Sequence, residues 1–287
     1  MKKIAILADT SVFFSKEYLK KHPNLKIIEL GLNLKNQLKK ITNKDDLASY
    51  LEKNMVTTSQ CSLETIKNTC YQILKEYNQI IIFSISRKLS SLYYNYLKIS
   101  ENTKDLKNKI FVVDNLSTSS LLAKQIDYCL TFIEKNQDDQ LKIHKFLNNL
   151  NSICQNIIKN QKNFIFLNSL MPLIDGGRVN KKIIKLSEKL KLKFILTLQN
   201  GELKKIAKIR TIKKGMIKFL NKTINQNLNI EKIDVRYSSY ENIDLKRYLE
   251  EYFQKNKNWK INFLPFSDIL ISHLGINVIG VTIWIKK

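Results

Sequence analysis

Hydroxyl side chains recur where the apolar runs of this chain end. Thr10 follows the apolar run 4–8, and Ser90 follows the run 80–85. The segment 57–62, which we expect to be a hydroxyl-rich loop, opens with two threonines and a serine. In open α/β sheets, ligands bind beyond the carboxyl ends of the strands. Hydroxyl groups there can donate hydrogen bonds to an anionic oxygen. The pattern favours an anion site, although serine and threonine are also ordinary loop and capping residues.

The second half of the chain supplies a cationic complement. Gly176 and Gly177 stand directly before Arg178, one of only five arginines. A glycine pair lets backbone or a ligand approach closely, and a guanidinium offers a fixed fork of donors. His273 stands between an apolar run, which predicts a strand, and a glycine turn at Gly275. Both features also have plain structural readings, as a turn with a surface arginine and as a packed histidine.

The net charge is +24, from 49 basic and 25 acidic residues. Arginine, which reads phosphate and guanine with two hydrogen bonds, is rare in this basic set, so the excess does not predict a specific nucleic-acid surface. Abundant lysine, isoleucine and asparagine with little glycine are typical of AT-rich coding. Lysines near an anionic membrane each add about 1 kcal/mol of attraction, so a transient membrane contact stays open.

Cysteine, histidine and glycine narrow the function further. The four cysteines form no close pair, the three histidines lie far apart, and Gly31 is the only glycine before Gly176. This spacing predicts no metal site and reduced thiols, and it excludes a glycine-rich nucleotide loop from the first half. With no leader-like start and no apolar run near the ~20 residues of a membrane span, we predict a cytoplasmic protein.

The order of apolar runs predicts an α/β fold in two domains. Residues 1–162 alternate strands and helices, which is typical of a parallel sheet; residues 163–287 are richer in strands and predict an α+β domain. In the first domain the expected strands are 4–8, 25–30, 80–85 and 109–113, with helices at 45–53, 63–77 and 89–99 and two more before residue 160. In the second they are 164–167, 194–198, 203–209, 230–237, 260–264 and 277–285, with helices at 180–190, 212–223 and 244–254. Asn200-Gly201 predicts a hairpin turn.

Taken in order, the motifs resemble those of the DegV family, whose characterised members bind fatty acids and include the lipid-binding subunits of bacterial fatty acid kinases. The resemblance covers essentially the whole chain. Its elements are Asp9-Thr10-Ser11, Thr57-Thr58-Ser59-Gln60-Cys61-Ser62, Ser86-Arg87-Lys88-Leu89-Ser90-Ser91-Leu92-Tyr93, Gly176-Gly177-Arg178-Val179, Lys208-Ile209-Arg210-Thr211 and His273-Leu274-Gly275-Ile276-Asn277.

The resemblance implies a long-chain fatty acid in an apolar tunnel between the two domains, with no further cofactor. The family positions that bind the carboxylate fall on Thr58, Ser90 and His273, with Arg178 nearby. Seven residues are expected to support the site: Asp9, Thr10, Thr57, Ser59, Gln60, Gly176 and Gly177. Arg210 falls on the position associated with docking of a separate kinase subunit, which would form acyl phosphate for phospholipid synthesis.

Three departures from the family pattern bear on the site. Ser91-Leu92 replaces Gly-Thr and is expected to remove one hydroxyl and add bulk close to Ser90. Cys61 replaces proline, and Ile276-Asn277 replaces Pro-Gly after His273. We expect an altered pocket shape and a rebuilt turn, with binding retained.

Two other function classes stay open. Ser90, His273 and Asp9 are the residue types of a hydrolase triad acting on a lipid ester, but no G-x-S-x-G elbow surrounds Ser90. A basic nucleic-acid-binding protein is the other alternative, and it predicts strongly salt-dependent binding.

Overall fold

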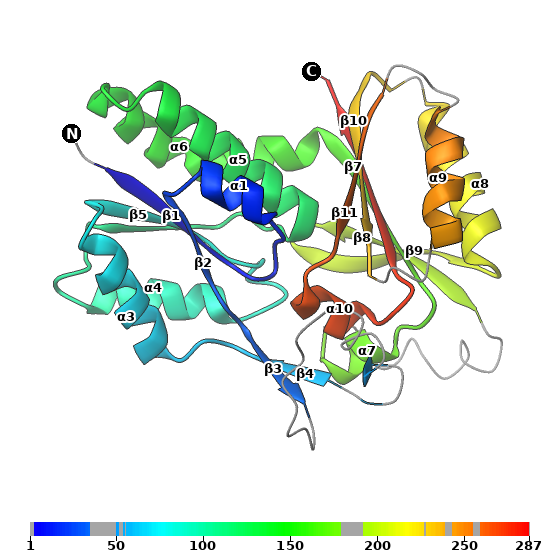
Figure 1. Cartoon of the computed structure of the whole chain (residues 1–287), viewed down its shortest axis with the longest axis horizontal. Helices are drawn as coiled ribbons and strands as arrows, with labels where there is room; N and C mark the ends of the chain where they lie inside the picture. Colours follow the sequence, from blue (N-terminus) through cyan, green and yellow to red (C-terminus); the bar gives the residue numbers. More distant parts are fainter. Residues whose placement is uncertain are drawn as a thin grey trace. The chain divides into compact units, whose positions relative to one another are not determined.

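The computed structural model describes residues 3–34, 50–51, 54, 56–178, 192–226, 228–238, 243–254 and 259–286 (Figure 1). The chain divides into two compact units. The first unit contains residues 1–31, 58–159 and 200–202, and the second contains 32–57, 160–199 and 203–287. The single domain boundary near residue 162 stays a prediction.

The first unit is built on a parallel four-stranded sheet in the order β2-β1-β5-β6. Every residue of β1 is buried, which explains why its sequence is apolar throughout. The predicted parallel α/β arrangement is confirmed. The strands are β1 (Ile4–Asp9), β2 (Leu25–Ile28), β5 (Gln79–Phe83) and β6 (Ile110–Val113).

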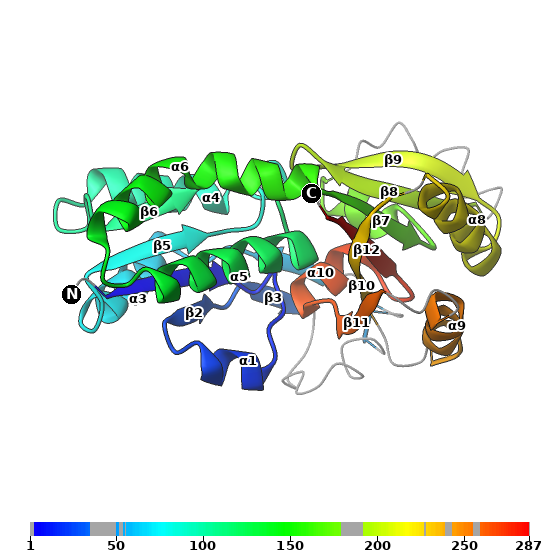
Figure 2. The same cartoon turned by 90° about the horizontal axis from the view of Figure 1, so that it is seen from above.

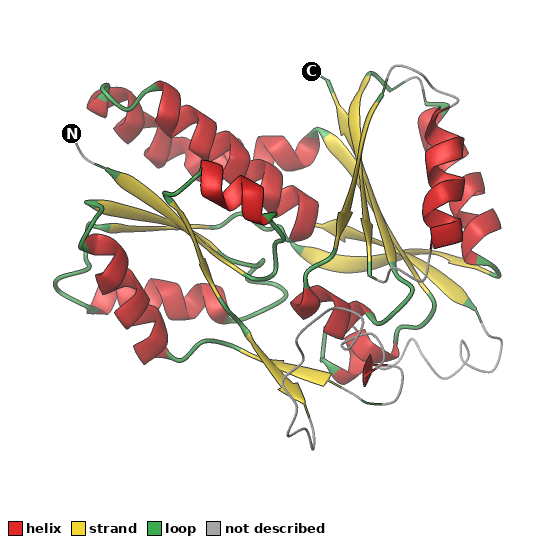
Figure 3. Ribbon diagram, in the orientation of Figure 1, coloured by secondary structure: helices red, strands yellow, loops and turns green. Residues whose placement is uncertain are grey.

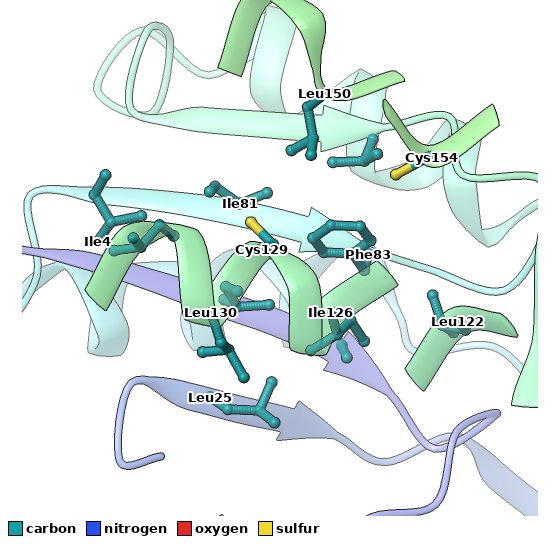
Figure 4. Close-up of a cluster of buried hydrophobic side chains, with 14 of the residues drawn as sticks. Ile4, Leu25, Ile81, Phe83, Leu122, Ile126, Cys129, Leu130, Leu150 and Cys154 are labelled. Carbon is teal, nitrogen blue, oxygen red and sulfur yellow. The ribbon is translucent and has the colours of Figure 1, made fainter. Parts of the chain in front are cut away.

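Helices cover both faces of this sheet (Figure 1). On one face, α5 and α6 pack through residues such as Cys129, Leu130 and Leu150 against Ile81 and Phe83 (Figure 4). On the other face lie α3 and α4. The helices are α1 (Lys16–Lys21), α3 (Leu63–Leu74), α4 (Leu92–Asn102), α5 (Ser119–Lys135) and α6 (Gln140–Lys159). In the part of the chain that the structure describes, no helix combines the length and apolar character needed to cross a bilayer.

The hydroxyl-rich segment 57–62 was expected to be a loop throughout, and this is wrong for its first three residues: Val56–Ser59 forms strand β4, which pairs with β3 (Gly31–Leu34). Valine and threonine are β-branched and favour the extended backbone. The helix expected at 45–53 lies mostly outside the described residues, as does all of the helix expected at 180–190.

The second unit holds a mixed six-stranded sheet in the order β11-β10-β12-β7-β8-β9. Strands β10 and β11 are parallel, whereas β10–β12, β12–β7 and β7–β8 are antiparallel. This confirms the expected α+β character. The strands are β7 (Gln161–Leu167), β8 (Lys193–Gln199), β9 (Glu202–Ile209), β10 (Ile230–Tyr237), β11 (Lys260–Pro265) and β12 (Ile279–Ile285).

Two helices, α8 (Ile212–Ile224) and α9 (Ile243–Gln254), lie side by side against one face of this sheet (Figures 2 and 3). The hairpin between β8 and β9 turns at Asn200 and Gly201, whose φ angles are 51° and 81°. Positive φ at both turn positions matches the hairpin turn that the Asn-Gly pair predicts.

Sequence reasoning missed two short helices in the second unit, α7 (Met171–Asp175) and α10 (Asp268–Leu274). The expectation that His273 follows a strand is therefore wrong, because His273 lies in the last turn of α10. An apolar run this short fits a strand and a buried helix equally well. The deciding local signal is Ser267, whose hydroxyl caps the helix by accepting a hydrogen bond from the Leu270 N–H at 3.4 Å.

Candidate functional site

Four polar side chains form a hydrogen-bonded group in the first unit, which we call the hydroxyl cluster: Gln60, Ser90, Ser91 and Asn95. Gln60 follows β4, and the other three lie at the start of α4. The Gln60 Nε2 donates to Ser91 Oγ at 2.7 Å and to Ser90 Oγ at 3.3 Å. Its Oε1 accepts from Asn95 Nδ2 at 2.9 Å. The structure thus brings the predicted residues Gln60 and Ser90 together.

The Ser90 hydroxyl oxygen accepts hydrogen bonds from two neighbours. Its Oγ accepts from the Leu92 N–H at 3.2 Å as well as from Gln60. A hydroxyl oxygen has two lone pairs and one hydrogen, so two accepted bonds leave only the hydrogen to be shared. Ser90 is therefore set up as a donor, which suits an oxygen that can only accept, such as that of a carboxylate.

The other predicted hydroxyls of this region lie on or next to β4. Thr58 is half-buried within β4, two residues before Gln60. Thr57 is exposed and its Oγ1 accepts from Asn33 Nδ2 at 3.5 Å. A Cβ on Gly31 would lie 2.2 Å from Ser59 Oγ, so a larger residue there would require the exposed Ser59 side chain to turn away. The side chains of Thr57 and Ser59 thus both lie against β3.

Asp9 and Thr10 support the edge of the parallel sheet. The buried Asp9 carboxylate accepts from the Ser11 N–H at 2.8 Å and from the Ile85 N–H at 2.7 Å, which ties the end of β1 to the end of β5. Thr10 Oγ1 accepts from the Leu30 N–H at 3.0 Å. Burial raises the pKa of Asp9. Because both of its carboxylate oxygens bond backbone amides, Asp9 has the contacts of a structural brace and not of a triad acid.

In the second unit, α7 and α10 lie in contact and bring three predicted residues together: Gly176, Arg178 and His273, the histidine–arginine cluster. A Cβ on Gly176 would lie 3.0 Å from His273 Nδ1 and 3.4 Å from an Arg178 guanidinium nitrogen. Arg178 donates to the backbone carbonyl of Gly176. Because Gly176 has no side chain, the His273 imidazole can lie close to its backbone.

The electrostatics of this cluster make the histidine neutral. Burial, with the Arg178 charge as a second cause, lowers the pKa of His273 to about 4. Burial also lowers the pKa of Arg178, which nevertheless keeps its charge at neutral pH. The cluster thus presents one cation and one neutral imidazole, which can donate one N–H bond.

Backbone conformation explains the glycines around this cluster. Gly177 has a φ of 75° with no atom within 4 Å of an added Cβ, so it serves the turn after α7. Gly275 has a φ of 81°, and Asn277 has a φ of 59°. Asparagine tolerates this left-handed region better than most residues. Asn277 thus adopts the kind of backbone that glycine would in the rebuilt turn after His273.

The structure also shows where the other two departures from the family pattern, Leu92 and Cys61, lie. Leu92 is fully buried in the core with Ile66 and Tyr96, so its side chain fills the α3–α4 core. Cys61 donates its thiol to the Glu29 carbonyl at 3.0 Å and anchors the chain just before α3. The added bulk of Leu92 is thus absorbed by the core of the first unit.

Arg210 is exposed directly after β9, at the start of α8. Between Glu202 and Glu231 the sequence contains no acidic residue but seven lysines besides Arg210. This stretch forms edge strand β9 and helix α8, so Arg210 lies within a basic region of the second unit.

Sequence reasoning missed Asn95 and the bond made by Ser91. One signal was available, since positions four apart face the same side of a helix. Nothing in the sequence marks Gln60 as their partner, because that contact joins residues far apart in the chain. Within the described ranges, no three metal-ligating side chains gather into a candidate metal site.

The parallel sheet and the mixed sheet define a two-unit α/β protein in which each unit contains a polar cluster. Residues 3–286 match a family described as "Uncharacterised protein, DegV family". The chain belongs to the DegV family.

Individual relatives agree with this assignment. A DegV domain-containing protein of Staphylococcus aureus strain N315 is 27% identical over 296 residues, covering 100% of both chains. The fatty acid binding DegV family protein of Streptococcus agalactiae has the same fold, with a TM-score of 0.79, 20% identity and 100% coverage of both chains. A DegV family protein of Eubacterium eligens loaded with heptadecanoic acid gives a TM-score of 0.76 at 16% identity, covering 99% of this chain and 100% of that one.

Proposed function

We propose that this chain is a fatty-acid carrier: it buries a long-chain fatty acid and presents the carboxylate to a separate kinase subunit for acyl phosphate formation. In this role Thr58, Ser90, His273 and Arg178 bind the carboxylate. Membership of the DegV family supports the proposal, because relatives with this fold are described as binding fatty acids.

The observation that carries the proposal is the fixed donor at Ser90. Its Oγ accepts two hydrogen bonds, from Leu92 N–H and Gln60 Nε2, so a ligand atom facing it must be an acceptor. Arg178 adds a positive charge, and the neutral His273 adds one N–H. A carboxylate transferred from water without such partners costs several kcal/mol, whereas each buried methylene of the acyl chain contributes about 0.8 kcal/mol.

The kinase step is assigned to a partner because the chain lacks a glycine-rich loop for a triphosphate. Arg210 is the proposed docking residue, since it is exposed within a basic region that suits an acidic partner surface. We place the protein in the cytoplasm, where its lysine excess would also favour brief contact with anionic membranes. The hydrolase alternative gains no support from Asp9, whose oxygens bond backbone amides.

Mass spectrometry of an organic extract of the purified protein tests the carrier proposal directly. We expect co-purified long-chain fatty acid, and we expect titrated heptadecanoic acid to bind better than heptadecan-1-ol. The protein with ATP and magnesium should form no acyl phosphate alone. Acyl phosphate made by the isolated chain, or binding of neither ligand, would contradict the proposal.

Three single variants test the assignment of the carboxylate donors. Thr58→Val, Ser90→Ala and His273→Ala should each weaken heptadecanoic acid binding by about 1–3 kcal/mol, because a charged acceptor loses one donor. Ser100→Ala is the matched control, since the Ser100 hydroxyl donates only to the Leu97 carbonyl within α4. If all three variants bind as tightly as the control, the residue assignment is wrong.

A further inference from the structure

We propose that Gln60 determines the head-group specificity of the site: it occupies the second lone pair of the Ser90 hydroxyl, so that Ser90 can donate but not accept. This inference rests on the fatty-acid binding proposed above. It predicts selection for a head group that only accepts hydrogen bonds, which is a carboxylate. Alcohols, amides and amines, which offer hydrogens of their own, find no acceptor at Ser90.

The Gln60 amide donates both of its hydrogens within the hydroxyl cluster. Its nitrogen carries two hydrogens, and these are donated to Ser91 Oγ at 2.7 Å and Ser90 Oγ at 3.3 Å. Its oxygen accepts from Asn95 Nδ2 at 2.9 Å, which fixes the orientation of the amide. Gln60 therefore has no hydrogen left for a ligand, and it acts on the ligand through Ser90.

The Ser91 side chain does not make the capping hydrogen bond that its position predicts. It is the N-cap residue of α4, where a serine hydroxyl ordinarily accepts a backbone N–H of the first turn. Here the Ser91 side chain makes no capping bond and accepts from Gln60 instead. The Ser91 hydroxyl therefore helps to hold the Gln60 amide in place.

Removing the Gln60 amide would change what Ser90 can do. Ser90 Oγ would keep the bond from the Leu92 N–H and regain one lone pair. It could then accept from an alcohol as well as donate to a carboxylate. The affinity ratio between two ligands that differ only in head group therefore reports on Gln60.

The test compares heptadecanoic acid and heptadecan-1-ol on the unchanged chain and on Gln60→Met, which keeps length but removes both donors. We expect the acid-to-alcohol affinity ratio to fall about tenfold in Gln60→Met, the equivalent of one hydrogen bond. General damage to the site weakens both ligands alike and leaves the ratio unchanged. An unchanged ratio with both ligands bound overturns the role of Gln60, whereas no acid binding by the unchanged chain contradicts the proposed function itself.

A second variant, Gln60→Glu, adds a readout that a structural role would not produce. At pH 8 the introduced carboxylate accepts the Ser90 hydrogen and repels the ligand, so acid affinity should fall at least about tenfold relative to the unchanged chain. The defect should shrink towards pH 5, as the new carboxyl group protonates. Gln72→Glu, which adds the same charge at an exposed position of α3, is the control. A defect of equal size at both pH values overturns the inference.

Discussion

The hydroxyl cluster of the first unit and the histidine–arginine cluster of the second position their hydrogen-bond donors by different means. In the hydroxyl cluster, Gln60, Ser90, Ser91 and Asn95 are neutral and bond one another through side chains. In the histidine–arginine cluster, a cation and an imidazole lie close together in partly desolvated surroundings. The first cluster is ordered by hydrogen bonds and the second by close packing at a glycine.

Because of this difference, we expect the hydroxyl cluster to set the geometry of hydrogen bonding and the histidine–arginine cluster to attract a negative charge. No side chain of the hydroxyl cluster titrates between pH 4 and pH 8, so its donor geometry does not change with pH. The histidine–arginine cluster carries the charge, and its imidazole changes protonation state near pH 4. We therefore expect hydroxyl variants to alter head-group selectivity, and variants of the second cluster to alter affinity and pH dependence.

The largest effect is expected for Arg178→Ala. Removing the cation should weaken heptadecanoic acid binding about 10- to 150-fold, because hydrogen bonds to charged groups contribute about 1.5–3 kcal/mol. The pKa of His273 should rise in the same variant, since the Arg178 charge is one of the two causes that lower it. Titration calorimetry and an NMR pH titration of the imidazole measure the two effects.

Arg247→Ala is the control for this prediction, because Arg247 is an exposed arginine of α9. It should change neither value. Wild-type affinity in Arg178→Ala would show that the Arg178 charge does not contribute to fatty-acid binding.

The adjacent glycines give a matched pair with smaller effects. A Cβ at Gly176 would meet His273 Nδ1 at 3.0 Å and the Pro172 carbonyl at 3.2 Å, so Gly176→Ala should displace the imidazole and weaken binding about tenfold. Gly177→Ala meets nothing but forces alanine to a φ of 75°, which costs about 1–2 kcal/mol of stability. Calorimetry and urea unfolding of both variants should separate the two losses. Equal affinity in the two variants would contradict the packing role of Gly176.

Stability should depend on pH through His273. Its pKa in the folded chain is about 4, below the ordinary 6.5, so the unfolded state binds more protons between these values. The contribution of the neutral imidazole is therefore fully present above about pH 7 and is lost as the pH falls towards 4. Because the side chain is only partly buried, we expect a loss of about 1–2 kcal/mol, measured by urea unfolding at pH 7 and pH 4.5.

His273→Gln isolates this contribution, because glutamine does not titrate. The buried Asp9, whose pKa is raised, is present in both proteins, so its own effect cancels in the comparison. The difference between the two unfolding curves should shrink as the pH falls. Parallel curves across the pH range would show that His273 does not titrate as described.

The fold was largely predictable because its strands are buried on both faces or alternate clearly. The runs at β1 and β5 are apolar enough to require a covered parallel sheet, and Asn200-Gly201 encodes its own turn. The short helices α7 and α10 were not predictable, because each is too short to show a helical period. Placing His273 on a helix depended on the Ser267 cap, a weak local signal.

The structure brings some of the predicted site residues together, but their contacts could not be predicted from the sequence. Hydroxyls after strands and glycines before Arg178 are visible in a sequence, and the family pattern selects among them. The bond from Gln60 to Ser91 joins two segments that only the folded chain brings together. Likewise, Gly176 was expected to allow close approach, but only the packing of α7 against α10 identifies His273 as the side chain that approaches it.

Arg210→Ala should have the smallest effect on binding and a clear effect on transfer. Arg210 is exposed after β9 and belongs to neither cluster, so fatty-acid occupancy and affinity should equal those of the unchanged chain. An arginine at the centre of a docking surface can contribute about 2 kcal/mol, so acyl phosphate formation at low carrier concentration should slow about 30-fold with a cognate kinase and ATP. Saturating carrier should restore the rate, because the variant weakens docking and leaves the carboxylate in place.

Arg247→Ala again serves as the control. Lost occupancy in Arg210→Ala would place this residue in the ligand site, and an unchanged rate would remove it from the docking surface.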